Sequence, residues 1–135
     1  MMKPIPIGAK GSFTLLVQPQ HLANQFKDAT LPAVFATPVM IMTMENAALN
    51  AIKAYLDPGE SAVGTAVDVR HLAATPVGRR VTAEAEVTKV AGRQIEFTVR
   101  ANEGNREIGV GTHARAVIDV AKFARRLAKE ERDSE

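Results

Sequence analysis

The sequence contains no cysteine and no tryptophan, and its aromatic side chains are limited to five phenylalanines and one tyrosine. Without cysteine, the chain can form no disulfide within itself, no thiolate metal site and no cysteine nucleophile. So few aromatic side chains do not provide the stacking platforms that single-stranded nucleic acids require, and a net charge of +2 does not indicate a basic patch. We therefore expect no nucleic-acid partner.

A long uninterrupted apolar run is also missing. The best candidate, Val39–Leu56, is interrupted by Glu45, Asn46, Asn50 and Lys53, whereas a membrane-spanning helix needs about 20 predominantly apolar residues. The N-terminal residues lack an apolar core of signal-peptide length. We therefore expect no membrane segment and take a cytoplasmic location as the default.

The overall composition is that of an ordinary globular protein, with 46% hydrophobic and 24% charged residues. A chain of 135 residues is long enough to bury a core and short enough to do so once. We therefore expect residues 1–135 to form a single domain.

The stretch Thr37–Leu56 predicts a long helix. Thr37 can cap its N-terminus, and Pro38 suits the first helical position, where no amide donor is needed. Because most of the other side chains are apolar, we expect this helix to be buried nearly all round. Glu45 lies in its middle, and a buried carboxylate requires a partner or a function.

Segments in which apolar residues alternate with polar ones surround this helix. Ser12–Val17 predicts one strand before it, and Val63–Ala73, Arg80–Val90, Gln94–Asn102 and Glu107–Val117 predict four consecutive antiparallel strands after it. Such alternation is typical of a sheet with one buried face. These elements permit a curved antiparallel sheet wrapped around a single apolar helix, and this α+β arrangement is the hotdog fold.

Two further segments lie outside the predicted sheet. Gln18–Ala33 is a long connection containing Pro19 and Pro32, and such connections often form loops or lids over functional sites. Asp119 predicts the N-cap of a C-terminal helix with a charged face and an apolar stripe. The stripe consists of Val120, Phe123, Ala124, Leu127 and Ala128.

Three stretches of the sequence resemble the fluoroacetyl-CoA thioesterase-like family, a branch of the hotdog-fold acyl-CoA thioesterases. They read FATPVMIMTMENA from Phe35, GTAVDVRHLAATPVG from Gly64 and GVGTHARAVI from Gly109. The resemblance covers most of the chain, from near Phe13 to Phe123. It implies the hotdog fold and hydrolysis of an acyl-CoA thioester, with no cofactor because CoA is part of the substrate.

The resemblance also implies a set of site residues. The active site of the family combines a threonine or serine, a glutamate eight residues later and a histidine twenty-six residues after the glutamate. Thr37, Glu45 and His71 stand at this spacing and are thereby implied to be catalytic. Gly64 and Arg115 match a glycine and an arginine that contact acyl-CoA in the family, and are thereby implied to bind the substrate.

The sequence departs from the specialised member of the family in the segment before Thr37. That member carries an aromatic lid residue where this chain has Leu31 before Pro32. The resemblance therefore implies thioesterase chemistry without implying specificity for a fluorinated acetyl group.

The three candidate catalytic residues have chemistry that suits thioester hydrolysis. Glu45 can act as a general base on water or as a nucleophile through a mixed anhydride, and both roles stay open. His71, with an ordinary pKa of about 6.5, can orient the attack and protonate the departing thiolate. The Thr37 hydroxyl would polarise the carbonyl at a helix N-terminus, where developing negative charge is favoured.

Each candidate also has a structural interpretation. Thr37 suffices as a helix cap, Glu45 as the partner of an arginine such as Arg115, and His71 as a strand histidine bonded to the backbone. His21 and His113 are interpreted as structural or solvated, and three separated histidines without a helical i,i+4 pair predict no metal site.

The sequence also leaves alternative functions open and indicates how the chain assembles. A non-catalytic hotdog module that binds acyl-CoA and a hotdog hydratase or dehydratase are the alternatives to a hydrolase. Because a single curved sheet leaves edges to be covered, and because the family usually dimerises, we expect a homodimer. The acyl group, the subunit that supplies each site residue, and gating by residues 18–33 are not defined by the sequence.

Overall fold

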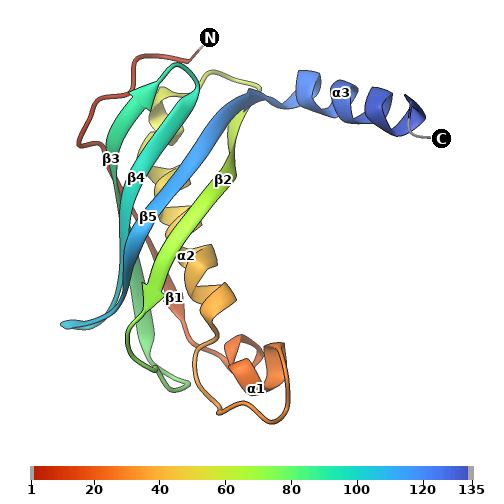
Figure 1. The fold of residues 1–135 in the computed structure, drawn as a ribbon. Coiled ribbons are helices and arrows are strands. Elements are labelled where there is room, and N and C mark those ends of the chain that lie inside the picture. Colours follow the sequence, from red (N-terminus) through yellow and green to blue (C-terminus); the bar gives the residue numbers. More distant parts are fainter. Residues whose placement is uncertain (1, 134–135) are drawn as a thin grey trace.

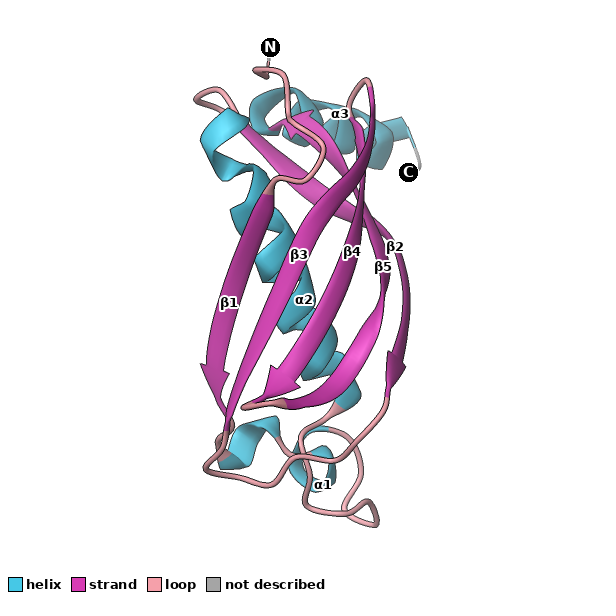
Figure 2. Cartoon of the chain, turned by 90° about the vertical axis from the view of Figure 1, so that its left-hand side faces the viewer, coloured by secondary structure: helices cyan, strands magenta, loops and turns pink. Residues whose placement is uncertain are grey.

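The computed structural model describes residues 2–133, which form one five-stranded antiparallel sheet and a central helix (Figure 1). The helix, α2 (Thr37–Ile52), lies along the concave side of the sheet, and the strands curve around it in Figure 2. The predicted curved sheet around one long helix is therefore confirmed.

All five predicted strands are present, with ends displaced by a few residues. They are β1 (Lys10–Leu16), β2 (Glu60–His71), β3 (Arg80–Ala91), β4 (Gln94–Glu103) and β5 (Arg106–Asp119). The order across the sheet is β1-β3-β4-β5-β2, so the first two strands in the chain form its two edges. The long connection from β1 to β2 carries α2 across the inner face.

The inner face of the sheet is made by strict alternation. The buried side chains of β3 and β4 are Val81, Ala83, Ala85 and Val87, and Ile95, Phe97, Val99 and Ala101. Polar side chains alternate with them and point to the outer face. The alanines keep the inner face shallow, so that α2 can lie close against it.

Close contact between β1 and α2 depends on a glycine. A Cβ atom on Gly11 would overlap the Ala51 nitrogen and the Ala47 carbonyl oxygen, both of which are backbone atoms of α2. At this point the strand and the helix touch backbone to backbone, which no larger residue allows.

Two expectations for α2 are wrong. The α-helix ends at Ile52 and continues as a 3-10 turn, η2 (Lys53–Tyr55), so Leu56 lies outside it. The helix is also not buried all round, because Met42 is 39% exposed and the Glu45 side chain is 36% exposed. The sheet covers only one side of α2, and the described chain has no second layer over the other side.

The predicted N-cap is wrong by one residue. Ala36 has the extended conformation that precedes the helix, and the amides of Val39 and Met40 donate to its carbonyl at 3.1 and 3.0 Å. Thr37 is therefore the first residue within α2, followed by Pro38. Its hydroxyl caps no amide and is engaged elsewhere.

The segment between β1 and α2 folds beneath the N-terminal end of α2 (Figure 1). It contains two short helices, η1 (Pro19–His21) and α1 (Ala23–Phe26). We refer to residues 18–33 as the lid segment.

The C-terminal helix, α3 (Val120–Asp133), starts where it was predicted. The Lys122 amide donates to Asp119 Oδ1 at 2.9 Å, which confirms Asp119 as its cap. The helix projects away from the sheet in Figure 1, and its apolar stripe is uncovered: Val120 is 48% and Leu127 is 50% exposed. Among the described residues, no helix has the length and apolar character that crossing a membrane requires.

Candidate active site

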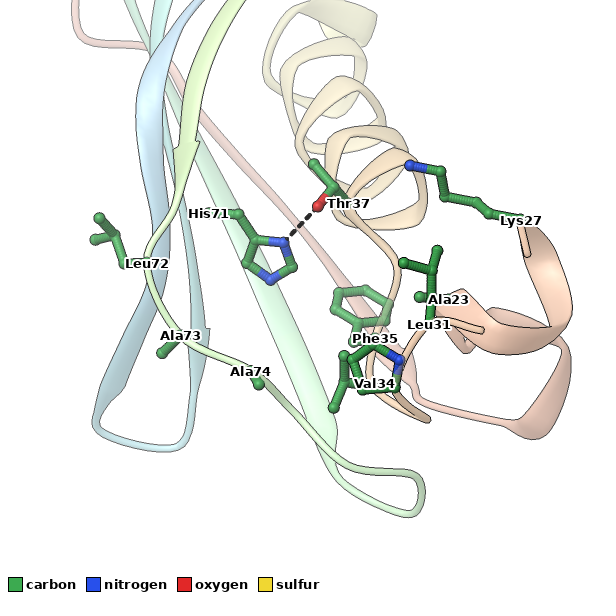
Figure 3. A pocket seen from close by; sticks show the side chains of 11 residues that line it. Ala23, Lys27, Leu31, Val34, Phe35, Thr37, His71, Leu72, Ala73 and Ala74 are labelled. Atoms are coloured by element: carbon green, nitrogen blue, oxygen red, sulfur yellow. Dashed lines mark hydrogen bonds between the residues drawn. The ribbon is translucent and has the colours of Figure 1, made fainter. Parts of the chain in front are cut away.

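A cavity of about 430 Å³ lies where the lid segment meets the start of α2 and the end of β2 (Figure 3). The lid side is mainly apolar and includes Leu31 and Phe35, with Lys27 as its cation. Thr37 and His71 supply the polar groups of the opposite side. A mostly apolar cavity with a few convergent polar groups is the usual form of a small-molecule site.

Thr37 and His71 form a direct pair in this cavity. The Thr37 Oγ1 atom lies 2.8 Å from His71 Nδ1, as the dashed line in Figure 3 shows. One residue opens α2 and the other closes β2, so the fold joins positions that are distant in sequence. Because Ala36 rather than Thr37 precedes the helix, the hydroxyl is available for this bond.

The environment of His71 favours its neutral form. Burial lowers the pKa of the imidazole, and a backbone contact with Ala73 only partly opposes this effect. The Nε2 atom is buried and has no hydrogen-bond partner among residues 2–133. A neutral imidazole has one nitrogen that donates a hydrogen bond and one that accepts, so it can orient a neighbouring hydroxyl group.

Glu45 belongs to a second cluster further along α2. Its Oε2 atom lies 3.9 Å from Arg115 Nη1, which makes an ion pair. Gly64 in β2 lies opposite Arg115 in β5, and a Cβ atom at Gly64 would come 2.9 Å from the same Oε2 atom. The missing side chain at position 64 is therefore what gives the carboxylate room to reach the guanidinium.

Arg115 is held on several sides and is only 8% exposed. Its Nη2 donates to the Ala62 carbonyl oxygen at 2.6 Å, and its Nη1 donates to His113 Nε2 at 3.1 Å. Burial lowers the pKa of Arg115, while the charge of Glu45 raises it. A guanidinium remains charged under such shifts, so a fixed cation lies behind the Glu45 carboxylate.

The structure thus brings the five predicted site residues together as two groups. Thr37 and His71 form one, and Glu45, Gly64 and Arg115 form the other; both lie where α2 faces β2. No hydrogen bond or ion pair within residues 2–133 connects the two groups. Eight residues of helix separate Thr37 from Glu45 by about 12 Å along the axis, so the two groups would meet only across a substrate.

Sequence reasoning missed two members of these surroundings. Lys27 lines the cavity from the lid segment, and no spacing rule in the sequence connects it with Thr37 or His71. His113 bonds to Arg115, and only their alternate positions on one strand hinted that they share a face. Within the described residues, no group of three His, Cys, Asp or Glu side chains is placed to hold a metal ion.

A curved antiparallel sheet around one helix, with polar residues where the helix meets an edge strand, defines a hotdog protein. The family model described as fluoroacetyl-CoA-specific thioesterase matches residues 17–121. The fluoroacetyl-CoA thioesterase of Streptantibioticus cattleyicolor is 47% identical over 122 residues, which are 87% of this chain and 88% of that protein. The chain therefore belongs to the fluoroacetyl-CoA-specific thioesterase family, as its sequence predicted.

Solved structures agree with this assignment. A structure of the fluoroacetyl-CoA thioesterase FlK superposes with a TM-score of 0.88 at 39% identity, covering 94% of this chain and 98% of that one. A Thermus thermophilus member of the thioesterase superfamily gives a TM-score of 0.88 at 33% identity over 99% of this chain and 100% of the other. The predicted hotdog fold is confirmed.

Proposed function

We propose that this protein is an acyl-CoA thioesterase that hydrolyses a short-chain acyl-CoA thioester to the free acid and CoA. Membership of the thioesterase family supports this activity. The single structural observation that carries it is the Thr37–His71 hydrogen bond in the cavity beneath the lid segment. A hydroxyl paired with a neutral histidine at a helix N-terminus suits a carbonyl that develops negative charge.

In the proposed mechanism, Thr37 and His71 act on the thioester carbonyl. With its proton on Nδ1, His71 donates to Thr37 Oγ1, and the Thr37 hydroxyl proton is then directed to the carbonyl oxygen of the substrate. Its donation stabilises the oxyanion that forms on attack. His71 thus orients the hydroxyl, and in the general-base route the proton that Glu45 removes from the attacking water is the one that neutralises the departing CoA thiolate.

Glu45 performs the attack on the carbonyl carbon in one of two ways. As a general base it removes a proton from water, whose oxygen bonds to the carbonyl carbon while the carbon–sulfur bond breaks. As a nucleophile it forms a mixed anhydride and releases CoA, and water then hydrolyses the anhydride. In both routes Arg115 fixes the direction of the carboxylate, and Gly64 leaves it the space to turn.

The test is release of free thiol from a panel of acetyl-, fluoroacetyl-, propionyl- and butyryl-CoA, ranked by kcat/KM. We expect turnover by the wild type and a loss of about 10²-fold or more in kcat for Glu45→Gln, because a positioned acid or base contributes about 10²–10⁴-fold. Glu107→Gln, an exposed carboxylate of β5, is the matched control.

Other outcomes of this panel would favour the alternatives. Tight binding of acyl-CoA without thiol release by the wild type would make the protein a binding module. Interconversion of enoyl- and hydroxyacyl-CoA without thiol release would make it a hydratase. Near-normal turnover by Glu45→Gln would remove Glu45 from the mechanism.

We also propose that two copies of the chain associate as a homodimer. The strand β2 pairs with β5 alone, so its other edge is open, and Val67 on it is 42% exposed. Met42 on the uncovered side of α2 is 39% exposed, and a second copy that covered it together with this edge would bury both. Sedimentation equilibrium should give the dimer mass, and a monomer mass at micromolar concentration would contradict the proposal.

The remaining parts of the proposal concern the chain as a whole. Residues 1–135 would act as one hotdog domain without a cofactor of its own, since CoA arrives with the acyl group. The cytoplasm is the proposed location because CoA thioesters are made and used there.

A further inference from the structure

The proposed mechanism leaves His113 without a role, although this residue is buried at 3% exposure next to the Glu45 cluster. It lies near the middle of β5, two residues before Arg115. Polar side chains with so little exposure are normally satisfied by specific partners. The partners of His113 are therefore informative.

Both ring nitrogens of His113 are bonded, and each partner has only one possible role. Nδ1 lies 2.7 Å from the Ala66 carbonyl oxygen, which can only accept. Nε2 lies 3.1 Å from Arg115 Nη1, which can only donate. The ring must therefore carry its proton on Nδ1 and keep Nε2 free, which is the neutral form.

The remaining surroundings of His113 agree with a neutral ring. Burial and the charge of Arg115 lower its pKa, while the Ala66 backbone and the charge of Glu45 raise it, and the net direction is down. Phe97 on β4 stacks on the ring, with centroids 5.9 Å apart and planes 25° apart. Within residues 2–133, Arg115 and Glu45 are the charged groups that affect the pKa of this imidazole.

Arg115 is fixed through this ring. Its guanidinium donates to the Ala62 carbonyl oxygen and to His113 Nε2, and His113 Nδ1 in turn donates to the Ala66 carbonyl oxygen. These carbonyls flank the β-bulge between Gly64 and Ala66 in β2. Bulges commonly aim side chains next to active sites, and here the bulged strand fixes where the guanidinium stands.

We propose that His113 is a positioning residue of the thioesterase site, which holds Arg115 against Glu45 by joining it to the bulged part of β2. The inference rests on the proposed function in that Glu45 performs the attack. His113 touches no substrate; it acts by fixing the cation that directs the carboxylate. A displacement of about 1 Å at a reacting group can cost about 10²-fold in rate.

Three variants separate this role from simple core packing. His113→Phe keeps a ring against Phe97 and removes both polar bonds, whereas His113→Gln keeps an oxygen that can accept from Arg115. Phe97→Leu weakens the packing and leaves the polar bonds in place. All three are to be compared as folded protein, with thermal unfolding recorded beside kcat and KM.

Positioning and packing predict different results. Under the proposal, kcat of His113→Phe falls by about 10²-fold with a small change in KM, while His113→Gln and Phe97→Leu stay within a few-fold of the wild type. A kcat that follows thermal stability across the three variants, with Phe97→Leu as impaired as His113→Phe, would overturn it.

A second measurement does not depend on catalysis. Imidazole nitrogen NMR of the wild type at neutral pH should show His113 protonated at Nδ1 and unprotonated at Nε2, and a charged ring or the opposite tautomer would overturn the proposal. A crystal structure of His113→Phe should show the guanidinium moved away from Glu45. If the wild type hydrolyses no acyl-CoA, the proposed function fails, and these two measurements still decide the role of His113.

Discussion

The Thr37 hydroxyl could serve its own helix or the neighbouring strand, and in this fold it serves the strand. Ala36 is the N-cap residue that precedes α2 and offers no side-chain acceptor, which leaves the amides of the first turn less well satisfied than a serine or threonine cap would. In exchange, the hydroxyl bonds to His71 at the edge of the cavity. A candidate site residue thus occupies a position next to the helix start, where local stability alone would favour capping.

Replacing Thr37 by valine tests whether its hydroxyl serves catalysis and not helix capping. Thr37→Val keeps the branched shape and removes the hydroxyl, so we expect kcat to fall by about 10²–10³-fold, the usual cost of losing one oxyanion donor. Because the hydroxyl caps no amide, the melting temperature should change little. Thr37→Ser, which retains the hydroxyl, should keep most of the activity, and equal activity of the valine and serine variants would contradict the role.

Gly64 offers a test of the second cluster. In Gly64→Ala the added Cβ would stand 2.9 Å from Glu45 Oε2, so the carboxylate must turn away from Arg115. Because only the end of a flexible side chain has to move, stability should be nearly unchanged while kcat falls by about one to two orders of magnitude. Thr65→Ala, the exposed neighbour, is the control, and wild-type kcat in Gly64→Ala would show that the carboxylate does not need this space.

The strands and helices differ in how far their sequences determine them. The boundaries of β3 and β4 follow from alternation, because one face of each strand is buried by α2 and the other meets solvent. The uncovered side of α2 carries its polar residues Glu45, Asn46 and Asn50. Ile41 and Met42 also lie on that side, and these apolar side chains made the helix resemble one that is buried all round.

The contact between β1 and α2 gives a prediction about stability. Gly11→Ala should lower the free energy of unfolding by about 1–3 kcal/mol, because its Cβ meets backbone atoms of α2 that cannot rotate away. Urea unfolding measures the change. Ser12→Ala, the next residue of β1 and exposed, should be nearly neutral, and equal stability of the two variants would contradict a backbone-to-backbone contact.

The folded protein as a whole should lose stability as the pH falls below neutral. Burial lowers the pKa of both His71 and His113 below the value of about 6.5 that unfolded histidine has. Between these lowered pKa values and about pH 6.5, the unfolded chain binds more protons than the folded one. The contribution of the two histidines to the free energy of unfolding is therefore fully present above about pH 6.5 and is lost as the pH drops through the folded pKa values.

Unfolding experiments between pH 8 and pH 5 measure this decline. His113→Gln removes one of the two imidazoles whose pKa is lowered and should make the dependence shallower. The lowered pKa values of Asp28 and Asp119 act only at more acidic pH, near and below their ordinary 3.8. A free energy of unfolding that increases as the pH is lowered from 7 to 5 would contradict lowered pKa values for the two histidines.

The candidate site could be predicted only in part, because some of its residues follow a sequence pattern and others are brought together by an irregularity of the sheet. The spacing of Thr37, Glu45 and His71 matches a family pattern and could be recognised in the sequence. The fold then brings Thr37 and His71 into contact because the start of α2 faces the end of β2. The link from His113 to Arg115 depends on a bulge in β2 that shifts the register by one residue. Alternation in the sequence does not locate such a bulge, and so the link was not predictable.

The lid segment is closed at its base by two backbone hydrogen bonds. The Ala23 amide donates to the Val34 carbonyl at 2.7 Å, and the Ala36 amide donates to the His21 carbonyl at 2.9 Å. The residues between them, including Leu31, therefore form a loop whose two ends are held together by backbone groups, independently of the side chains within the loop. In evolutionary terms, mutations inside this loop can reshape one wall of the cavity while the Thr37–His71 pair stays intact, so the proposed substrate preference could change without loss of that pair.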